Sequence, residues 1–258
     1  MDITRLSNIE RQQIVYQLLD ERKRIRLSEV SRELGVSIAT ARRVVDSLVN
    51  QGKVQRVHGG AILNRTAPPE IAINERQYEQ LAEKRMIGTL AADLIADGET
   101  VFISSGTTAL EVAKNLVDRQ RLTVITNSLP VLATFASRKQ ITLIALGGEF
   151  RHGESSFIGY LTDQNLNELR ADKVIIGIRA ISLSEGLTNF SLNEAIIDRK
   201  IISIGKEIII VADHTKIDRV TTAFVAPITT MHTLVTGPEA DPNFIEKLLN
   251  LGIKVVMQ

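Results

Sequence analysis

The feature that most constrains the fold is a series of short apolar runs in the second part of the chain. Each run is rich in β-branched residues, and a segment of helix length separates it from the next run. The runs are 101–103, 123–126, 142–146, 173–178, 207–212 and 233–236, and the helical segments lie near 108–117, 129–137, 160–169, 192–204 and 242–251. Buried strands that alternate with helices predict an α/β structure with a mainly parallel sheet.

Polar loops follow several of these strands, at the ends where parallel sheets bind ligands. Ser104-Ser105-Gly106-Thr107-Thr108 leads directly into a helix, whose free N–H groups and positive end suit a phosphate or another anion. The same segment would also serve as an ordinary Ser/Thr-capped helix start. Further loops contain Thr126-Asn127-Ser128, Gly147-Gly148-Glu149-Phe150-Arg151 and Ala212-Asp213-His214-Thr215-Lys216. Arg151 and Lys216 could neutralise a phosphate, or could be surface cations.

The segment 26–61 has a different pattern, which predicts two short helices joined by a tight turn. Leu27, Val30 and Leu34 repeat at helical spacing, with Ser28 as the expected N-cap and Gly35 as the expected end. The second helix has Ser37 as its expected N-cap and Ala41, Val44, Val45 and Leu48 as its buried face. An earlier helix at 9–19 would pack behind this pair, and 53–58 would form part of a two-stranded wing.

Basic and small side chains gather at the exposed start of the second helix. A helix-turn-helix places such side chains in the major groove, where arginine can bridge O6 and N7 of guanine. For an isolated basic helix a solvated face would be the better interpretation, but the two helices, the capped turn and the basic wing together favour DNA recognition. The residues predicted to contact DNA are Ser37, Ala39, Thr40, Arg42, Arg43, Lys53, Arg56 and His58.

The charge distribution supports a division of the chain into two functions. Residues 1–65 hold 12 Lys and Arg against 7 Asp and Glu, a balance of +5, while the remainder holds 19 against 23, a balance of −4. A basic N-terminal part on a mildly acidic body is typical of a nucleic-acid module joined to another domain. We therefore expect a DNA-binding domain at 1–63, a linker at 64–74 that contains two prolines, and a second domain at 75–258 that opens with a long helix at 75–95.

Composition excludes several other classes of protein. The chain has no cysteine, so it can form no disulfide and offers no thiol chemistry. Its start lacks the apolar segment of a signal peptide, and no stretch has the length of apolar residues that spans a bilayer. We expect a soluble, cytoplasmic protein. The four histidines lack metal-ligand spacing and no GxSxG motif is present, so the sequence indicates neither a metal site nor a hydrolase, and no cofactor.

The N-terminal segment resembles the DeoR/GlpR family of bacterial transcriptional regulators, a winged helix-turn-helix family. The resemblance rests on Gly35-Val36-Ser37, on Thr40-Ala41-Arg42-Arg43 and on Arg56-Val57-His58-Gly59-Gly60-Ala61. The family usually has Asp-Leu after the paired arginines, whereas this chain has Val44-Val45. An ion pair that orients the arginines is therefore not expected from that position.

The second domain resembles the same family over almost its whole length. Matching motifs include Ser105-Gly106-Thr107-Thr108, Thr126-Asn127-Ser128, Glu194-Ala195 and Asp213-His214-Thr215-Lys216. The resemblance implies an oligomeric effector-sensing domain, a homodimer or homotetramer, similar in fold to ribose-5-phosphate isomerase and CoA transferases. It implies a phosphorylated sugar or a related metabolite as the effector, operator DNA as the partner, and repression of carbohydrate catabolism genes. The residues expected to bind the effector are Ser105, Gly106, Thr107, Thr108, Asn127, Ser128, Gly148, Arg151, Glu194 and Lys216.

Three residues depart from the family pattern near the expected pocket. Ser104 stands where Asp is usual, Arg179 where a small residue is common, and Asp198 where Lys is frequent. The basic, bulky Arg179 leads to the hypothesis of a smaller or more acidic ligand. The alternative function is a sugar-phosphate isomerase-like enzyme with an appended DNA-binding module, for which Asp172, Glu194 and Lys216 could supply acid–base groups.

Overall fold

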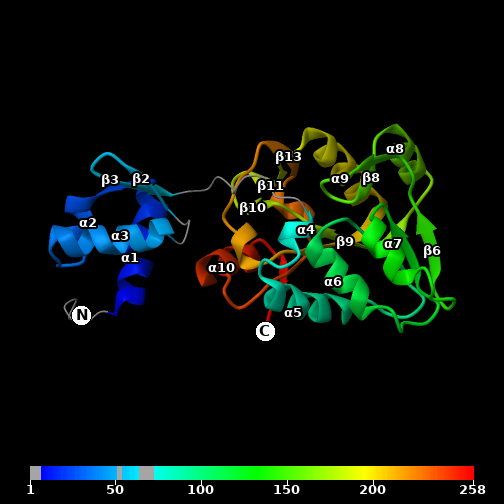
Figure 1. The fold of residues 1–258 in the computed structure, drawn as a ribbon. Helices are drawn as coiled ribbons and strands as arrows, with labels where there is room; N and C mark the ends of the chain where they lie inside the picture. Colours follow the sequence, from blue (N-terminus) through cyan, green and yellow to red (C-terminus); the bar gives the residue numbers. More distant parts are fainter. Residues whose placement is uncertain (1–6, 51–53, 64–72) are drawn as a thin grey trace. The chain divides into compact units, whose positions relative to one another are not determined.

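The computed structural model describes residues 7–50, 54–63 and 73–258, and the chain divides into two compact units, Met1–Thr66 and Ala67–Gln258. The described elements of the first unit are α1 (Asn8–Arg22), β1 (Arg24–Arg26), α2 (Leu27–Glu33), α3 (Ile38–Asn50), β2 (Val54–Val57) and β3 (Gly60–Leu63), which are shown in Figure 1. The helix, turn, helix and wing expected from the sequence are all present.

The caps of the first unit explain where its helices begin. Ser37 caps α3, because its Oγ accepts from the Thr40 N–H at 3.2 Å. The expectation that Ser28 caps α2 is wrong. That helix begins at Leu27, and the Arg26 N–H donates to the Glu29 carboxylate at 2.6 Å. The carboxylate at the third helical position therefore accepts the free N–H group of the residue that caps the helix.

The wing is a three-stranded antiparallel sheet in the order β1-β3-β2. Strand β1 was not expected, because three residues that follow a helix directly carry too short a pattern to be read as a strand. Gly60 is required where β3 pairs with β1, since a Cβ there would lie 2.1 Å from the carbonyl oxygen of Ile25. The three helices and the sheet enclose a core that includes Val15, Leu19 and Val45.

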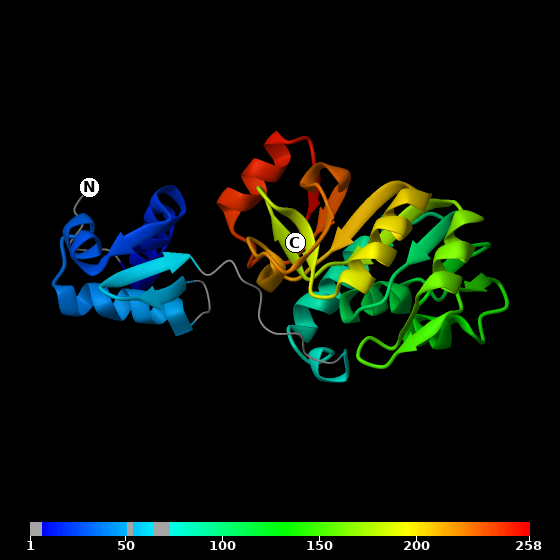
Figure 2. The same ribbon diagram turned by 90° about the horizontal axis from the view of Figure 1, so that it is seen from above.

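The second unit is an α/β structure, seen from above in Figure 2. It begins with α4 (Ile73–Arg76), α5 (Leu81–Ala92), β4 (Thr100–Ile103), α6 (Thr107–Asn115), β5 (Thr123–Thr126), α7 (Leu129–Phe135), β6 (Thr142–Ala145), β7 (Glu149–Arg151), β8 (Ser156–Ile158) and α8 (Tyr160–Asn167). It continues with β9 (Ala171–Gly177), β10 (Ala180–Ser182), β11 (Gly186–Asn189), α9 (Leu192–Ile204), β12 (Gly205–Val211), β13 (Ala223–Ala226), β14 (Thr233–Val235), α10 (Pro242–Asn250) and β15 (Lys254–Val256).

A seven-stranded sheet in the order β15-β14-β12-β9-β4-β5-β6 forms the centre of this unit, and all of its pairings are parallel. The six apolar runs identified in the sequence supply six of its strands. Two smaller sheets, β10-β11-β13 and the hairpin β7-β8, are antiparallel. They were not expected, because their strands have three or four residues and lie inside polar loops.

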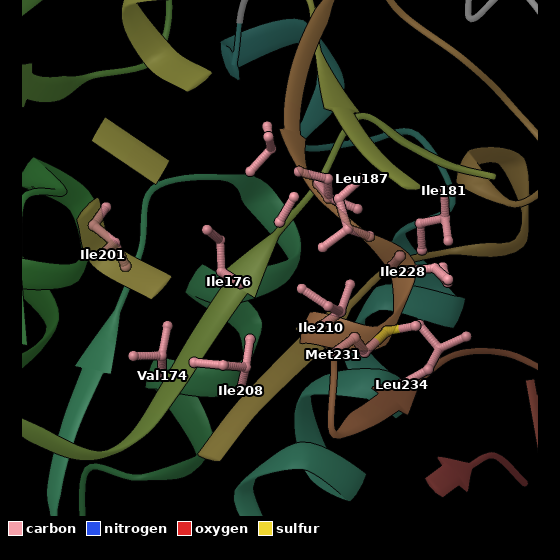
Figure 3. Close-up of a cluster of buried hydrophobic side chains, with 14 of the residues drawn as sticks. Val174, Ile176, Ile181, Leu187, Ile201, Ile208, Ile210, Ile228, Met231 and Leu234 are labelled. Carbon is pink, nitrogen blue, oxygen red and sulfur yellow. The ribbon is translucent and has the colours of Figure 1, made fainter. Parts of the chain in front are cut away.

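Both faces of the large sheet are buried, which explains why its strands are continuously apolar. Val174, Ile176, Ile208 and Ile210 face the core shown in Figure 3, which α8, α9 and α10 also line. The intervening Ile175 and the corresponding residues of other strands face a second core, lined by α5, α6 and α7. Alternation along each strand thus divides the apolar side chains between two layers of helices.

The prediction of one long helix at 75–95 is wrong, because two separate helices occupy this segment. The short helix α4 ends at Arg76, and α5 begins only at Leu81, after Gln80 at φ 48°. This left-handed backbone at Gln80 separates two helices that the sequence pattern had joined. Of the linker expected at 64–74, residues 64–72 lie outside the described part of the chain. Among the described helices, none combines the length and the apolar character needed to cross a membrane.

Candidate functional site

A polar cleft lies at the carboxyl ends of β4, β9 and β12. The chain leaves β4 toward β5 and β6, and then returns to place β9 on the other side of β4. The cleft therefore occupies the point where strand order reverses, which is the common ligand site of open α/β sheets.

The loop after β4 forms one wall of the cleft. Ser104 is buried, and its hydroxyl accepts from the Gly177 N–H at 3.3 Å, which ties the loop to the end of β9. Gly106 has φ 115°, a value that favours glycine, and α6 starts at Thr107 immediately afterwards. The buried Thr107 and Thr108 thus present their hydroxyls beside free N–H groups at a helix start.

Two lysines and the Asp213 carboxylate line this side of the cleft. Lys84 of α5 is buried and donates to the Arg76 carbonyl oxygen at 2.7 Å, and burial lowers the pKa of its ammonium group while Asp213 opposes that effect. Lys216 donates to the Thr215 hydroxyl at 3.0 Å and lies 3.9 Å from the Asp213 carboxylate. Both lysines line the cleft together with the start of α6.

A buried carboxylate between two arginines closes another side of the cleft. Arg76 Nη2 donates to both carboxylate oxygens of Glu154 at 2.6 Å, and Arg179 also donates to Glu154. Burial lowers the pKa of Arg76, as does the charge of Arg179, whereas Glu154 raises it. Glu154 lies in the turn of the hairpin β7-β8, so three segments distant in the sequence meet here. Both guanidinium groups thus bind the same buried carboxylate.

Two carboxyl groups on one face of α9 form the opposite, acidic side. Glu194 and Asp198 are four residues apart and both line the cleft. Glu194 pairs with Arg151 at 2.6 Å, while Asp198 accepts from the Asn189 amide at 2.8 Å. Burial raises the pKa of Glu194, and the charge of Glu154 adds to that effect. Burial, reinforced by the charge of Glu194, raises the pKa of Asp198 to about 8.

The predicted effector residues divide into those that the fold brings to the cleft and those that it does not. Ser105, Gly106, Thr107, Thr108, Glu194 and Lys216 line the cleft. Arg151 contacts it through Glu194 rather than directly. The remaining three have other contacts: Asn127 donates to the Phe157 carbonyl oxygen, Ser128 caps α7, and a Cβ on Gly148 would meet Thr162 Oγ1 at 2.3 Å.

The sequence interpretation missed several residues of the cleft. Arg76, Lys84, Glu154 and Asn189 were not identified, and Arg179 and Asp198 were noted only as departures from a family pattern. Arg76 stands next to the predicted linker and Glu154 in a polar turn, where charged residues are usually solvated. Only the tertiary fold shows that both are buried together.

The predicted DNA contacts lie together at the start of α3 and on the wing. The side chains of Ser37, Ala39, Arg42 and Arg43 are exposed, and Thr40 is half-buried. His58 is exposed in the turn between β2 and β3, Arg56 pairs with Asp46 of α3, and Lys53 lies outside the described residues. A cationic, accessible helix start beside a short hairpin is the geometry with which winged helices read a major groove.

Two further groups of charged residues bear on catalysis and metal binding. Asp172 is at the amino end of β9, on the far edge of the sheet from the cleft, where it accepts from the Thr100 N–H and pairs with Lys206. Glu83, His214 and Glu239 have potential metal-ligand atoms within 4.8 Å of one another. His214 Nδ1 and Glu83 Oε2, however, already lie 2.7 Å apart in a hydrogen bond, which raises the pKa of His214.

Comparison with known protein families matches both units. Residues 11–67 match the DeoR-like helix-turn-helix domain, and residues 79–238 match the DeoR C terminal sensor domain. The chain is 32% identical over 232 residues to the transcriptional repressor AccR of Agrobacterium fabrum, covering 89% of this chain and 90% of that protein. It is 34% identical over 213 residues to a lactose phosphotransferase system repressor of Staphylococcus aureus, covering 81% and 84%.

Among solved structures, the proteins found are similar to this chain only at low sequence identity and low TM-score. Ribose 5-phosphate isomerase A from Methanocaldococcus jannaschii is 17% identical, with a TM-score of 0.39 and coverage of 56% of this chain and 55% of that chain. The beta subunit of eIF2B from Chaetomium thermophilum is 17% identical, with a TM-score of 0.40 and coverage of 75% and 52%.

Proposed function

This chain belongs to the DeoR family of DNA-binding transcriptional regulators, and from that premise we propose that it is a repressor of carbohydrate catabolism genes. A phosphorylated sugar or a related metabolite would bind the cleft of the second unit and change the affinity of the first unit for operator DNA. Its place of action would be the cytoplasm, where its DNA partner lies. The observation that carries the proposal is the start of α6 beside Lys84 and Lys216, in one chain with a winged helix-turn-helix.

The start of α6 is suited to the phosphate of such an effector. Thr107 and Thr108 offer hydroxyls, the first turn of the helix offers N–H groups, and the two lysines offer positive charge. The polar groups of Asn189, Glu194 and Asp198 across the cleft are suited to the hydroxyls of a sugar. An anion at one end and a hydroxyl-rich body at the other describe a sugar phosphate.

We propose that the cleft binds its ligand without converting it. Three groups could supply acid–base chemistry. Asp172 pairs with Lys206 at the edge of the sheet opposite the cleft, and Glu194 pairs with Arg151. Lys216 is beside the proposed phosphate position, where it would neutralise charge rather than move a proton. Incubation of the protein with sugar phosphates, followed by analysis of the products, tests this point: turnover would favour the isomerase-like alternative.

We also propose a homodimer or homotetramer held by the second unit. Large apolar side chains are exposed on adjoining elements: Tyr160 and Leu161 on α8, Leu192 and Ile196 on α9, and Phe224 on β13. Helix α9 packs against both α8 and β13, so the three elements that bear these side chains are neighbours. A dimer would present two α3 helices to half-sites spaced by about one helical turn or a multiple of it. Light scattering on the full chain and on Leu192→Ser measures the oligomeric state directly.

A thermal-shift screen of phosphorylated sugars, followed by an operator gel shift with each hit, tests the central proposal. A metabolite that binds the folded state raises its melting temperature by mass action. The same metabolite should change operator affinity, with a coupling typically worth about 1–3 kcal/mol in each direction. The proposal fails if no phosphate ester stabilises the protein, or if a stabilising ester leaves operator binding unchanged.

A further inference from the structure

The start of α3 has an exposed apolar side chain that the predicted DNA contacts do not include. Ile38 is 54% exposed, whereas the other large apolar side chains that the structure describes in the first unit are buried or half-buried. A single exposed apolar residue is ordinary on a protein surface, so its position carries the argument. Ile38 is the first residue of α3 (Figure 1), the helix that would enter the major groove.

Neither packing nor helix formation within the described first unit explains an isoleucine at this position. The core side of α3 is formed by Ala41, Val44 and Val45, which are buried, and Ile38 is not part of that core. A β-branched residue also favours a helix less than alanine does. The side chain of Ile38 therefore serves neither the core nor the helix of the free protein.

The direction of the Ile38 side chain suits a contact with the floor of a groove. In an α-helix every Cα–Cβ bond tilts toward the N-terminus, so the side chain of the first residue extends toward the end of the helix that approaches the bases. The neighbouring hydroxyls of Ser37 and Thr40 lie 3.0 Å apart in a hydrogen bond, and Ser37 also accepts from the Thr40 N–H. These two side chains serve the cap, whereas Ile38 has no part in it.

The surroundings of Ile38 indicate DNA rather than another protein as its partner. Arg42 follows it by one helical turn on the same side of α3, and both Arg42 and Arg43 are exposed. A cationic surface with an apolar side chain at its leading end suits a polyanion that has apolar groups inside its groove. The C5-methyl group of thymine is the apolar group that the major groove presents.

We propose that Ile38 contacts the methyl group of a thymine in the operator and is therefore a specificity-determining residue. The inference rests on the proposed DNA-reading surface, and it is independent of the proposed effector. One turn of an α-helix rises about 5.4 Å, and successive base pairs of B-DNA are about 3.4 Å apart. The thymine that Ile38 contacts thus lies within about two base pairs of the base or phosphate that Arg42 contacts.

Selection from a pool of random duplexes provides the first test, since it needs no known operator. The full chain and its Ile38→Ala variant each select duplexes from the same pool, and the enriched sequences are compared. We expect Ile38→Ala to lose the preference for thymine at one position of the recognised sequence and to keep the other preferences. Leu249→Ala is the matched control, because Leu249 of α10 is also 54% exposed but belongs to the second unit. Its selected sequences should equal those of the unmodified protein.

Deoxyuridine in place of thymidine isolates the methyl group, because uracil lacks only that group. It replaces each thymidine of the selected duplex in turn, and fluorescence anisotropy gives the dissociation constants. At the position that Ile38 contacts, the unmodified protein should bind about threefold to tenfold more weakly, as expected for the loss of one buried methyl group. Ile38→Ala should bind the thymidine duplex more weakly by at least this factor, and deoxyuridine at that position should then cause no further loss.

Two outcomes would overturn the inference. The first is that Ile38→Ala selects the same sequences as the unmodified protein. The second is that deoxyuridine weakens binding of both proteins equally at every position, which would assign Ile38 to the sugar–phosphate backbone. Ile38→Val keeps an apolar, β-branched side chain and should retain the sensitivity to deoxyuridine, so it separates a lost contact from a disturbed fold. If the full chain enriches no sequence from the pool, the proposed function itself fails.

Discussion

Nη1 of Arg56, on the first strand of the wing, lies 2.5 Å from Oδ1 of Asp46, on the helix that precedes it. The pair joins the wing to α3, and these are the two parts of the proposed DNA-reading surface. The side chains of Arg56 and Asp46 are 46% and 41% exposed, so the pair contributes less than about 1 kcal/mol to stability. Its main effect is to hold the guanidinium group beside α3.

Arg56→Ala should weaken DNA binding to a similar extent for all sequences. A phosphate contact carries no sequence information, and its loss should lower the slope of log K against log salt by about 1. Filter binding to operator and to unrelated duplex DNA, at several salt concentrations, measures this slope. Arg138→Ala, on the exposed surface of the second unit, is the control. A loss confined to the operator would show that Arg56 reads a base instead.

Arg43→Ala should weaken operator binding more than binding to unrelated DNA. The side chain is exposed near the start of α3, and a bidentate contact with guanine contributes about 1–3 kcal/mol of discrimination. Competition between operator and unrelated duplex at fixed salt gives the specificity ratio. An equal loss on both duplexes would assign Arg43 to the phosphate backbone. Arg42→Ala, measured in the same way, shows which of the two arginines reads a base.

The double variant Thr107→Ala, Lys216→Ala should bind operator DNA normally and lose its response to a phosphorylated sugar. Both side chains line the cleft, and neither belongs to the unit that contains the DNA-reading surface. Gel shifts with and without the ester measure the response. Lys139→Ala, Thr142→Ala alters an exposed part of the same unit and should respond like the unmodified protein. A normal response of the first variant would show that the effector binds elsewhere.

The elements that could be predicted from the sequence are those whose pattern is long or whose chemistry is local. The strand at 207–212 is apolar throughout because both of its faces are buried, and the Ser37 cap follows from a hydrogen bond three residues away. The three-residue strand β1 could not be predicted, because it depends on pairing with β3 more than thirty residues later. The break at Gln80 was missed because the helical pattern runs through it.

The cleft was only partly predictable for the same physical reason. The loop after β4 was found because a glycine and several hydroxyls precede a helix directly. Glu154 and Arg76 are 78 residues apart and meet through the hairpin β7-β8, which the sequence did not indicate. Asn127 and Gly148 were placed at strand ends correctly, but a strand end fixes a side of the sheet and not the direction of a side chain.

Asp198→Asn should stabilise the free protein at pH 8 more than at pH 5. The folded state raises the pKa of Asp198 to about 8 from an ordinary value near 3.8, so its contribution to stability is lost as pH rises between those values. Asparagine does not titrate, so the gain should grow by about 1–3 kcal/mol across this range. The raised pKa of His214 acts equally in both proteins and cancels. Urea unfolding at the two pH values measures the difference, and a gain independent of pH would place an ionised Asp198 in the folded state at pH 5.

Glu154→Gln should destabilise the second unit by about 3–5 kcal/mol, because it leaves the buried guanidinium groups of Arg76 and Arg179 without the carboxylate that both bind. Urea unfolding at pH 7 measures the loss, with Glu185→Gln in the exposed turn between β10 and β11 as the control. Inorganic phosphate should restore part of the lost stability, since an anion bound near the two arginines replaces the missing charge and binds only the folded state. A loss below about 1 kcal/mol would mean that the two arginines find water or other partners when Glu154 is gone. The arrangement of Arg76 and Arg179 would then be adaptable rather than fixed by this one carboxylate.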